Sequence, residues 1–279
     1  MSYKTVLVHV DESEHARERI KLAAVVAMAE NAHLVGTAMT GASRYIQRTK
    51  MLAELDPNFM IHLEFLHQRA NRGLEEFEAT VQQLGLVSFE KRLVDDEAAG
   101  GICLQARYCD LVVIGQIDPR EVSPVVMPDF PQYVVINSGR PVLIVPYSGK
   151  FENIGNRVLI AWDASMAATR TVTNALPLLK RAQIVEVALF NPESQPQVHG
   201  ALPGSDVAIY LARHGIKVEV LQRTTDADIG TALLALATEL DSDLLVMGGY
   251  GHSRFREILL GGVTRTVLEA MTIPVLMSH

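Results

Sequence analysis

Five glycines fall within the nineteen residues Gly248–Thr266, GGYGHSRFREILLGGVTRT, which follow directly on the apolar run DLLVM. Glycine lets a backbone adopt positive φ and approach a bound anion closely. The second pair, Gly261 and Gly262, precedes VTRTVLEAM, which has the pattern of a helix, and the start of a helix presents unpaired N–H groups that suit phosphate. The segment therefore predicts a phosphate-bearing ligand held largely by backbone groups, one part of it at each glycine cluster.

This segment differs from two familiar phosphate-binding loops. No Lys-Ser or Lys-Thr follows its glycines, as it would in a P-loop, and the first strand of this half ends in AWDAS rather than in GxGxxG. Between the glycine clusters, HSRFREILL adds His252, Arg254 and Arg256. Either arginine could meet a polyphosphate, and an ordinary solvated face is the alternative for each.

Composition excludes several other classes of function. The formal net charge is −7 and there is no basic run, which argues against a nucleic-acid partner. Cys103 and Cys109 lack metal-ligand spacing and are expected to be buried thiols. No apolar run approaches the roughly 18 residues of a membrane span, and MSYKTVLVHVDES lacks the features of a signal peptide. We therefore expect a cytoplasmic protein without a membrane partner.

The chain repeats itself. YKTVLVHVDES near the start matches GNRVLIAWDAS without a gap, so that Asp11 corresponds to Asp163. DLVVIG likewise matches DLLVMG, and a proline lies 26 residues after the glycine of each. We therefore predict two domains, residues 1–148 and 149–279, which join near SGKFENIGN. The first half carries extra residues around SRYIQRTKMLAELDPNFMIHLEF. Their amphipathic part, MLAELDPNFMIHLEFL, is expected to pack over the first domain or shape a cleft there, and a surface for a partner is the alternative.

Short apolar runs alternate with helical patterns in both halves. In the second half RVLIAW, VEVALF, IKVEVLQR, DLLVMG and PVLM read as strands. The helices between them have start and stop signals, with Ser165 as one N-cap, Asp226 or Asp228 as another, and Gly215 as a stop. The pattern predicts the α/β class, with two tandem doubly wound parallel-sheet domains of Rossmann-like type. Ligands of such sheets bind at the carboxyl ends of the strands, where the strand order switches direction.

The spacing Gly248-x2-Gly251-x9-Gly261 resembles the nucleotide loop of the universal stress protein family, Gly-x2-Gly-x9-Gly followed by Ser or Thr. LIAWDAS resembles that family's first strand and its aspartate, and PVLM resembles the closing strand through which family members dimerise. The resemblance covers essentially the whole chain as two such domains in tandem. It implies an adenine nucleotide α-hydrolase-like fold and a regulatory stress-response protein in the cytosol.

The same resemblance implies ATP, with or without Mg²⁺, or a related adenine nucleotide, bound in the second half only. Asp163 would hold the adenosine end, and the structural alternative is that this aspartate caps the following helix. The remaining residues that the resemblance places around the base, ribose and phosphates are Ala161, Met247, Gly248, Gly251, His252, Gly261, Gly262, Val263 and Thr264.

One residue departs from the family pattern. Where the family has Ser or Thr after the third glycine, this chain has Gly262, so a hydroxyl that would contact phosphate is missing. One lost hydrogen bond to a charged group is worth on the order of 1.5–3 kcal/mol, which weakens binding about tenfold or more. Thr264 is the nearby hydroxyl that could compensate.

The first half lacks most of the glycines that form the predicted nucleotide loop of the second half. Gly115 matches Gly248, but Gly251, Gly261, Gly262 and Thr264 are replaced by Asp118, Pro128, Asp129 and Pro131. Proline has no backbone N–H to offer, and carboxylates repel phosphates. We therefore predict that the first half does not bind ATP in the family manner. An unrelated ligand there, such as a cation meeting Asp11, Asp118 and Asp129, is the alternative to a decayed site.

Two other functions compete with nucleotide binding. A stress-related protein-interaction module would bind no nucleotide, and the glycines would then be turn residues. An enzyme is disfavoured because adenylyl-transfer motifs, a Ser/His/Asp constellation and metal-ligand spacing are absent from the sequence, although slow incidental hydrolysis of ATP is compatible with it. The closing strands PVLIVP and PVLM are expected to pair within one chain as a pseudo-dimer, with a homodimer as a further possibility.

Overall fold

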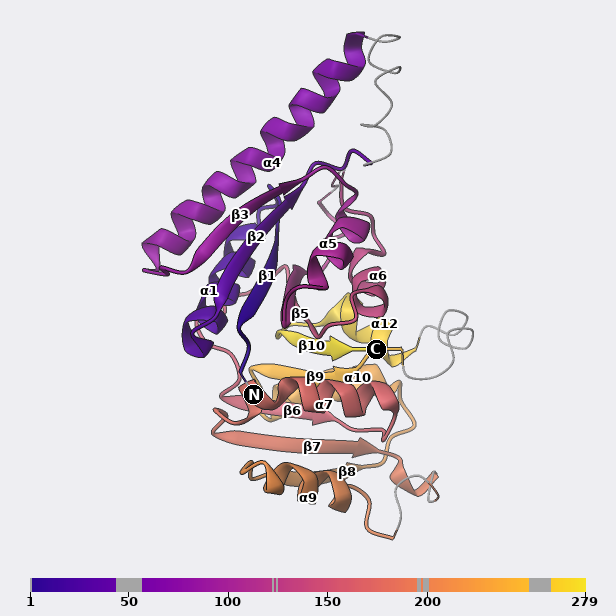
Figure 1. Cartoon of the computed structure of the whole chain (residues 1–279). Coiled ribbons are helices and arrows are strands. Elements are labelled where there is room, and N and C mark those ends of the chain that lie inside the picture. The colour runs from indigo at the N-terminus through magenta and orange to yellow at the C-terminus, as the bar shows by residue number, and fades with distance from the viewer. Residues whose placement is uncertain are drawn as a thin grey trace. The chain divides into compact units, whose positions relative to one another are not determined.

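The computed structural model describes residues 2–43, 57–121, 123, 125–194, 197, 201–250 and 262–279. The chain divides into two compact units, which we call the first unit, residues 3–140 with 150–152, and the second unit, residues 141–149 with 153–279. Strands and helices alternate within both, as the ribbon in Figure 1 shows. The predicted α/β class is therefore confirmed.

The first unit has four parallel strands in the order β3-β2-β1-β4. Helices α1 and α4 lie on one face of this sheet and α5 and α6 on the other (Figure 1). Its elements are β1 (Thr5–Val10), α1 (Ala16–Glu30), β2 (His33–Met39), α4 (Pro57–Gln83), β3 (Phe89–Val94), α5 (Ala98–Ala106), β4 (Leu111–Gly115) and α6 (Phe130–Asn137).

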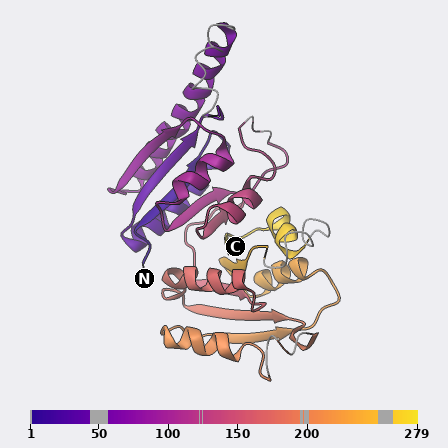
Figure 2. The same cartoon turned by 45° about the vertical axis from the view of Figure 1, so that its right-hand side comes forward.

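The second unit contains strands in the order β5-β10-β9-β6-β7-β8, parallel except for the antiparallel pair β5–β10. Helices α10 and α12 lie side by side (Figure 2). Its elements are β5 (Val142–Val145), β6 (Arg157–Ala161), α7 (Met166–Leu179), β7 (Ile184–Phe190), the 3₁₀ turn η1 (Pro192–Ser194), α9 (Ser205–Arg213), β8 (Glu219–Arg223), α10 (Ile229–Glu239), β9 (Leu244–Gly248), α12 (Val263–Ala270) and β10 (Val275–Ser278).

The apolar runs form the buried strands because each sheet is covered by helices on both faces. The residues of β4 and β9 that precede the final glycine are all buried. Helix starts follow the local signals: Ser165 accepts the Ala168 N–H, and Asp228, rather than Asp226, accepts the Thr231 N–H. These contacts confirm the predicted caps.

The sequence repeat is also a structural repeat. Strands β4 and β9 begin at residues 111 and 244, helices α6 and α12 at 130 and 263, and strands β5 and β10 at 142 and 275. Each pair is separated by the same 133 residues and has the same length. A residue of the first half can therefore be compared directly with its counterpart in the second.

Strand β5 belongs to the first repeat in sequence but packs with the strands of the second unit. Val142 lies opposite Met277, and Ile144 lies opposite Val275, in an antiparallel ladder. The predicted pairing of the two closing strands within one chain is thereby confirmed. The predicted domain boundary, after residue 148, is the point at which the sequence begins to repeat, and it stays a prediction. Packing divides the chain at a different point, between residues 140 and 141.

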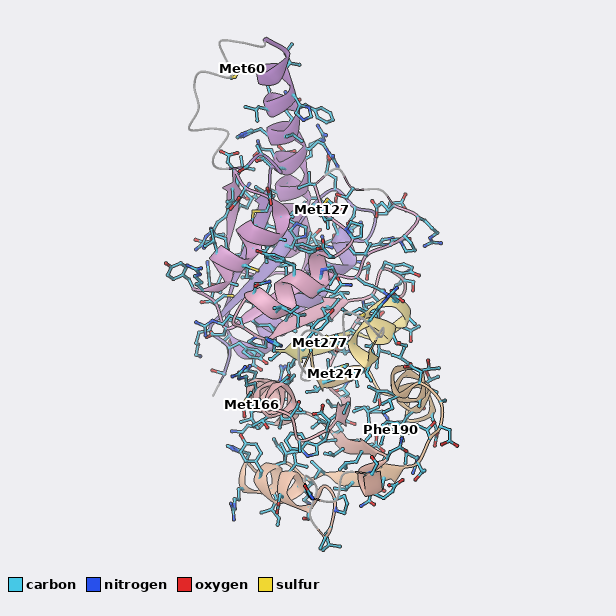
Figure 3. All side chains as sticks on the ribbon, turned by 90° about the vertical axis from the view of Figure 1, so that its right-hand side faces the viewer. Met60, Met127, Met166, Phe190, Met247 and Met277 are labelled. Atoms are coloured by element: carbon cyan, nitrogen blue, oxygen red, sulfur yellow. The ribbon has the colours of Figure 1, made fainter. Side chains whose placement is uncertain are left out.

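Helix α4 extends beyond the sheet that it covers. Its second half is anchored by Ala70, Leu74, Phe77 and Val81, which are buried. None of residues 60–69 is buried, and Met60 lies at the far end of the helix (Figure 3). The expectation that this segment packs over the first domain is therefore wrong for the exposed Met60, Ile61 and Phe65, whereas Leu66 lines a cleft there with Val10 and Asp11. The reason is length, since 27 helical residues span about 40 Å and a six-residue strand only about 20 Å.

Two expectations from composition were also tested. Cys103 and Cys109 are free and buried, as predicted, and burial raises the pKa of Cys103 to about 11 and that of Cys109 to about 12. Both are therefore thiols at neutral pH. Among the helices that the structure describes, none combines the length and apolar character needed to cross a membrane.

Candidate functional site

The switch point of the second unit lies between β6 and β9. The chain builds the sheet outward from β6 through β7 to β8, then returns to add β9 and β10 on the other side of β6. Ala161 at the end of β6 lies opposite Met247 of β9, which neighbours Met277 of β10 (Figure 3). Three predicted site residues, Ala161, Met247 and Gly248, thus share the carboxyl edge where doubly wound sheets bind ligands.

Asp163 follows β6 in a tight turn and is exposed. Its Oδ1 accepts the backbone N–H of Ser165 at 2.9 Å, and Ala164 between them has a left-handed φ of 57°. The side chain of Ser165 in turn accepts the Ala168 N–H at 3.1 Å and caps helix α7. The helix-capping alternative for Asp163 is therefore wrong, because Ser165 makes the cap. Asp163 presents a carboxylate at the strand edge.

Removing the α7 cap should loosen this turn. Ser165→Ala is expected to lower the free energy of unfolding of the second unit by about 1 kcal/mol, because the Ala168 N–H loses its acceptor. Urea unfolding followed by the fluorescence of Trp162, the one tryptophan of the sequence, measures the change beside the turn. Ser165→Thr, which keeps a hydroxyl, is the control; equal stability of both variants and wild type would contradict the assignment of the cap.

Gly248 is where the end of β9 meets the start of α7. A Cβ built on this residue would lie 2.6 Å from the backbone nitrogen of Ala168 and 2.9 Å from the carbonyl carbon of Ala167. Real Cβ atoms do not approach backbone so closely, so a glycine is required for this contact. The contact places the predicted glycine loop next to the turn that carries Asp163.

Helix α12 begins close to the same edge. Gly262 is its N-cap, with extended backbone, and Val263 and Thr264 form the first helical positions. The backbone N–H of Tyr250, just beyond β9, donates to Thr264 Oγ1 at 3.3 Å, and Thr264 is buried. The structure thereby brings the helix start next to the strand end. Other predicted residues lie outside the described ranges: Gly251, His252, Arg254, Arg256 and Gly261.

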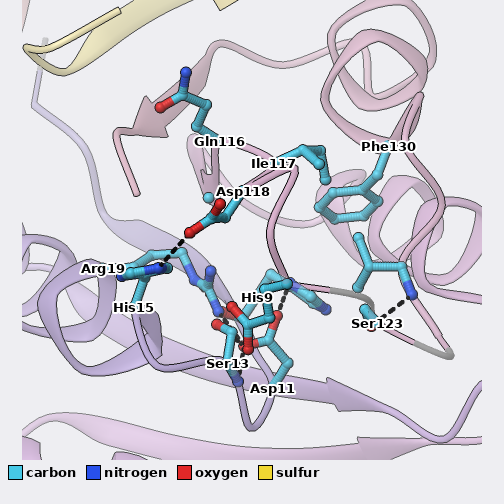
Figure 4. Close-up of a pocket in the computed structure, with 13 residues that line it drawn as sticks. His9, Asp11, Ser13, His15, Arg19, Gln116, Ile117, Asp118, Ser123 and Phe130 are labelled. Carbon is cyan, nitrogen blue, oxygen red and sulfur yellow. Dashed lines mark hydrogen bonds and ion pairs between the residues drawn. The ribbon is translucent and has the colours of Figure 1, made fainter. Parts of the chain in front are cut away.

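In the first unit the protein's own side chains line a pocket at the corresponding edge (Figure 4). Arg19 of α1 reaches across the end of β1, where its Nε donates to the His9 carbonyl and its Nη2 to Asp11 Oδ1, both at 2.8 Å. A Cβ built on Gly115 would lie 2.5 Å from Arg19 Nη1. The guanidinium thus occupies the space in front of the strand-end glycine. A hollow of about 510 Å³, including its solvent-open part, remains beside it.

The buried charges of this edge compensate one another. Burial alone would raise the pKa of Asp11, but the charge of Arg19, the nearby His9 and hydrogen bonds from Ser13 and Arg19 outweigh it and hold that pKa well below its usual range. Burial lowers the pKa of His9 to about 4, with Asp11 opposing and Arg19 reinforcing the shift. At neutral pH the cluster therefore contains an ion pair beside a neutral imidazole.

The start of α6 also differs from that of α12. Phe130 stands where α12 has Val263, is buried, and packs on the His9 ring with 4.9 Å between ring centroids. Pro131 stands where α12 has Thr264 and removes one of the N–H groups that the helix start would offer. Asp129 is the N-cap residue in place of Gly262. This helix start is therefore poorly suited to an anion.

The acidic residues of the first unit do not form a cation site. Asp118 pairs with Arg120 through both carboxylate oxygens and lies 3.1 Å from His15 Nε2. These hydrogen bonds, those of Arg120 above all, hold the pKa of Asp118 well below its usual range. No three His, Cys, Asp or Glu side chains converge as metal ligands anywhere in the part of the chain that the structure describes. The cation alternative for Asp11, Asp118 and Asp129 is therefore not supported.

Sequence reasoning missed the residues that fill the first site. Arg19 corresponds to Thr171 in the ungapped repeat, and Phe130 corresponds to Val263. A large side chain replaces a small one at both positions. A comparison of the two halves at every position would have found both replacements. The glycine loop and its counterpart contain only the replacement of Val263 by Phe130.

Comparison with known proteins agrees with the fold and the repeat. A solved universal stress protein from Archaeoglobus fulgidus DSM 4304 superposes with a TM-score of 0.74 at 17% identity, covering 98% of this chain and 94% of that one. A putative universal stress protein from Pseudomonas aeruginosa UCBPP-PA14 gives a TM-score of 0.57 at 16% identity, covering 98% and 92%. A curated universal stress protein of Synechocystis sp. is 24% identical over 257 residues, covering 88% of this chain and 83% of its own.

The sequence model of one family matches the chain twice. It describes the universal stress protein family and covers residues 2–146 and 155–279, so each repeat is one family domain. Together these matches account for nearly the whole sequence, including the turn of Asp11 and that of Asp163. The chain therefore belongs to the universal stress protein family, as a tandem of two domains.

Proposed function

We propose that this protein is a regulatory nucleotide-binding protein with a single site, in the second unit, for ATP or a related adenine nucleotide. One contrast carries the proposal. The carboxyl edge of the second unit holds small residues and an exposed carboxylate, Gly248 and Asp163, whereas in the first unit Arg19 lies against Gly115 and Phe130 packs on His9. In the first repeat a guanidinium of the protein lies against the strand-end glycine, whereas the second repeat has only Thr171 at the position that matches Arg19.

Each residue has a distinct task in the proposed site. Asp163 would accept hydrogen bonds from hydroxyl groups of the ribose, because an exposed carboxylate offers only acceptors. The backbone N–H groups at Gly262, Val263 and Thr264 would receive phosphate oxygens at the positive end of α12. Ala161 and Met247 would line the pocket beside the base. Gly251, His252 and Gly261 complete the proposed set, and Mg²⁺, if it accompanies the phosphates, would add positive charge to them.

Regulation would follow from linkage. A ligand that binds the folded second unit stabilises it by an amount that grows with the logarithm of the free ligand concentration, about 2.7 kcal/mol at 100 times the Kd. The proposal assigns no catalytic residue, and any slow hydrolysis of ATP would be incidental. A cytoplasmic location, a homodimer and the downstream protein partner belong to this proposal as expectations.

The proposal is tested by calorimetric titration of the full chain with Mg-ATP, ADP and AMP, after extraction and identification of any nucleotide that co-purifies. One adenine nucleotide per chain is expected. Asp163→Ala should weaken binding about tenfold to a hundredfold, because a charge-assisted hydrogen bond is lost. Two equivalent sites per chain, or unchanged affinity in this variant, would overturn the assignment.

A protein-interaction module that binds no nucleotide is the second candidate. The surface of helix α4 supports a protein-interaction role. Its Met60, Ile61 and Phe65 are each more than half exposed and have no role in the proposed nucleotide site. Exposed apolar residues grouped on one segment are typical of surfaces that bind other proteins. Absence of any nucleotide binding by folded, nucleotide-free protein would favour this candidate.

A further inference from the structure

Ser278 and His279 at the end of β10 hold both backbone groups of Gly249. The Gly249 N–H donates to the Ser278 carbonyl at 2.9 Å, and the Gly249 carbonyl lies 3.1 Å from His279 Nδ1. Because a carbonyl oxygen can only accept, Nδ1 is the protonated ring nitrogen in this contact. Gly249 is the first residue after β9, so this contact fixes the point from which the glycine loop departs.

The peptide unit that joins Gly249 to Tyr250 is held at both of its polar ends. His279 donates to its carbonyl, and its N–H donates to Thr264 Oγ1 in the first turn of α12. A peptide unit is planar and rigid, so two such contacts set its orientation completely. Tyr250 itself has a left-handed φ of 58°, which is costly for a residue with a side chain. Such a conformation persists only where the surroundings determine it.

The end of β10 is in turn fixed to helix α7. The Ser278 N–H donates to Thr171 Oγ1 at 3.0 Å, and the Asn174 amide donates to Ser278 Oγ at 3.1 Å. Arg170 Nη1 donates to the His279 carbonyl at 2.9 Å. Thr171 and Ser278 are buried, so these hydrogen bonds are shielded from water. The backbone that carries the His279 ring is therefore well supported.

The first repeat lacks the side chains that make the side-chain part of this network. At the positions of Gly249, Ser278, His279, Thr171 and Asn174 it has Gln116, Val145, Pro146, Arg19 and Leu22. A proline and two aliphatic side chains there cannot make these hydrogen bonds. The side chains of the network and the glycine loop occur together in the second half, and the first half lacks both. Because both halves share the fold, the network is associated with the loop and not with the fold.

We propose that His279 is a positioning residue of the nucleotide site: by donating Nδ1–H to the Gly249 carbonyl, it holds the strained Gly249–Tyr250 peptide between β10 and the start of α12. The inference rests on the proposed function, because its consequence is a Gly249–Tyr250 peptide pre-organised for the binding of an adenine nucleotide. Without the donor, binding would first have to order this peptide. His279 itself need not touch the ligand.

The test compares ATP affinity in two variants of the full chain. His279→Ala should weaken binding about tenfold, since one part-buried hydrogen bond and its ordering effect are lost. His279→Asn should restore affinity to within about threefold of wild type, because the asparagine amide nitrogen stands at the same distance along the side chain as Nδ1 and can donate to the same carbonyl. His214→Ala, at the C-cap of α9 with its ring on Tyr210, is the matched control and should bind like wild type.

The outcomes separate this inference from the proposed function. If wild-type protein binds no adenine nucleotide, the proposed function fails and the inference fails with it. If wild type binds and His279→Ala binds equally well, only the inference is overturned, and equal weakening in the alanine and asparagine variants also overturns it. Thermal unfolding of each variant checks the fold. Should His279→Ala not fold, His279→Leu, which fills the space without a donor, replaces it in the comparison with His279→Asn.

Discussion

Replacing Asp11 with alanine should lower the free energy of unfolding by roughly 3 kcal/mol, the low end expected when one partner of a buried ion pair is removed. The reason is Arg19, whose side chain is only 5% exposed and would retain its charge without the carboxylate that compensates it. Asp11 is 24% exposed, and water can partly replace it, which is why the low end of the range applies. Urea unfolding monitored by circular dichroism measures the loss.

The matched variant in the other repeat should behave in the opposite way. Asp163→Ala removes an exposed side chain and its hydrogen bond from the Ser165 N–H, and should lower stability by about 1 kcal/mol, while lowering nucleotide affinity. Asp11→Ala should leave nucleotide affinity unchanged. Combining Asp11→Ala with Arg19→Met should recover part of the lost stability, because no buried charge then remains unpaired. Equal destabilisation by the two aspartate variants would contradict the division of roles between the repeats.

His9 should make the protein less stable in mild acid. The folded state lowers the pKa of His9 from 6.5 to about 4, so between these values the unfolded chain binds a proton that the folded chain does not. Stability attributable to this residue is therefore present above pH 6.5 and is lost as the pH falls toward 4. A shift of this size corresponds to about 3 kcal/mol in full, of which about 2–3 kcal/mol should be lost between pH 7 and pH 4.5.

The measurement is the difference between wild type and His9→Leu, with both proteins unfolded in urea at pH 7 and pH 4.5. Leucine keeps an apolar contact to Phe130 but does not titrate, so the variant should lose less stability on acidification. The depressed pKa of Asp11 places its own contribution at lower pH, outside this interval. Identical pH dependence in the two proteins would mean that His9 is protonated in the folded state or accessible to water.

Local signals in the sequence were sufficient for the elements and for much of the candidate site. Apolar runs predicted the strands, and Ser165 and Asp228 marked the starts of α7 and α10. The repeat identified matching positions in both halves. These features depend on neighbours in sequence. The ion pair of Arg19 depends instead on where α1 crosses the end of β1, and its pattern is that of an ordinary helical residue. The exposed half of α4 went unpredicted for a similar reason, because periodicity describes one face of a helix but not the length of the sheet beneath it.

Strand β5 is covalently attached to the first repeat yet completes the sheet of the second unit. A fragment that starts at residue 149 would lack this strand and would expose the unpaired edge of β10, with Val275, Leu276 and Met277 available for pairing with another chain. Such a fragment is expected to self-associate or aggregate through this edge, which β5 covers in the full chain. Tethering the two repeats keeps the protective strand at a high effective concentration, so the edge stays covered even when the protein is scarce.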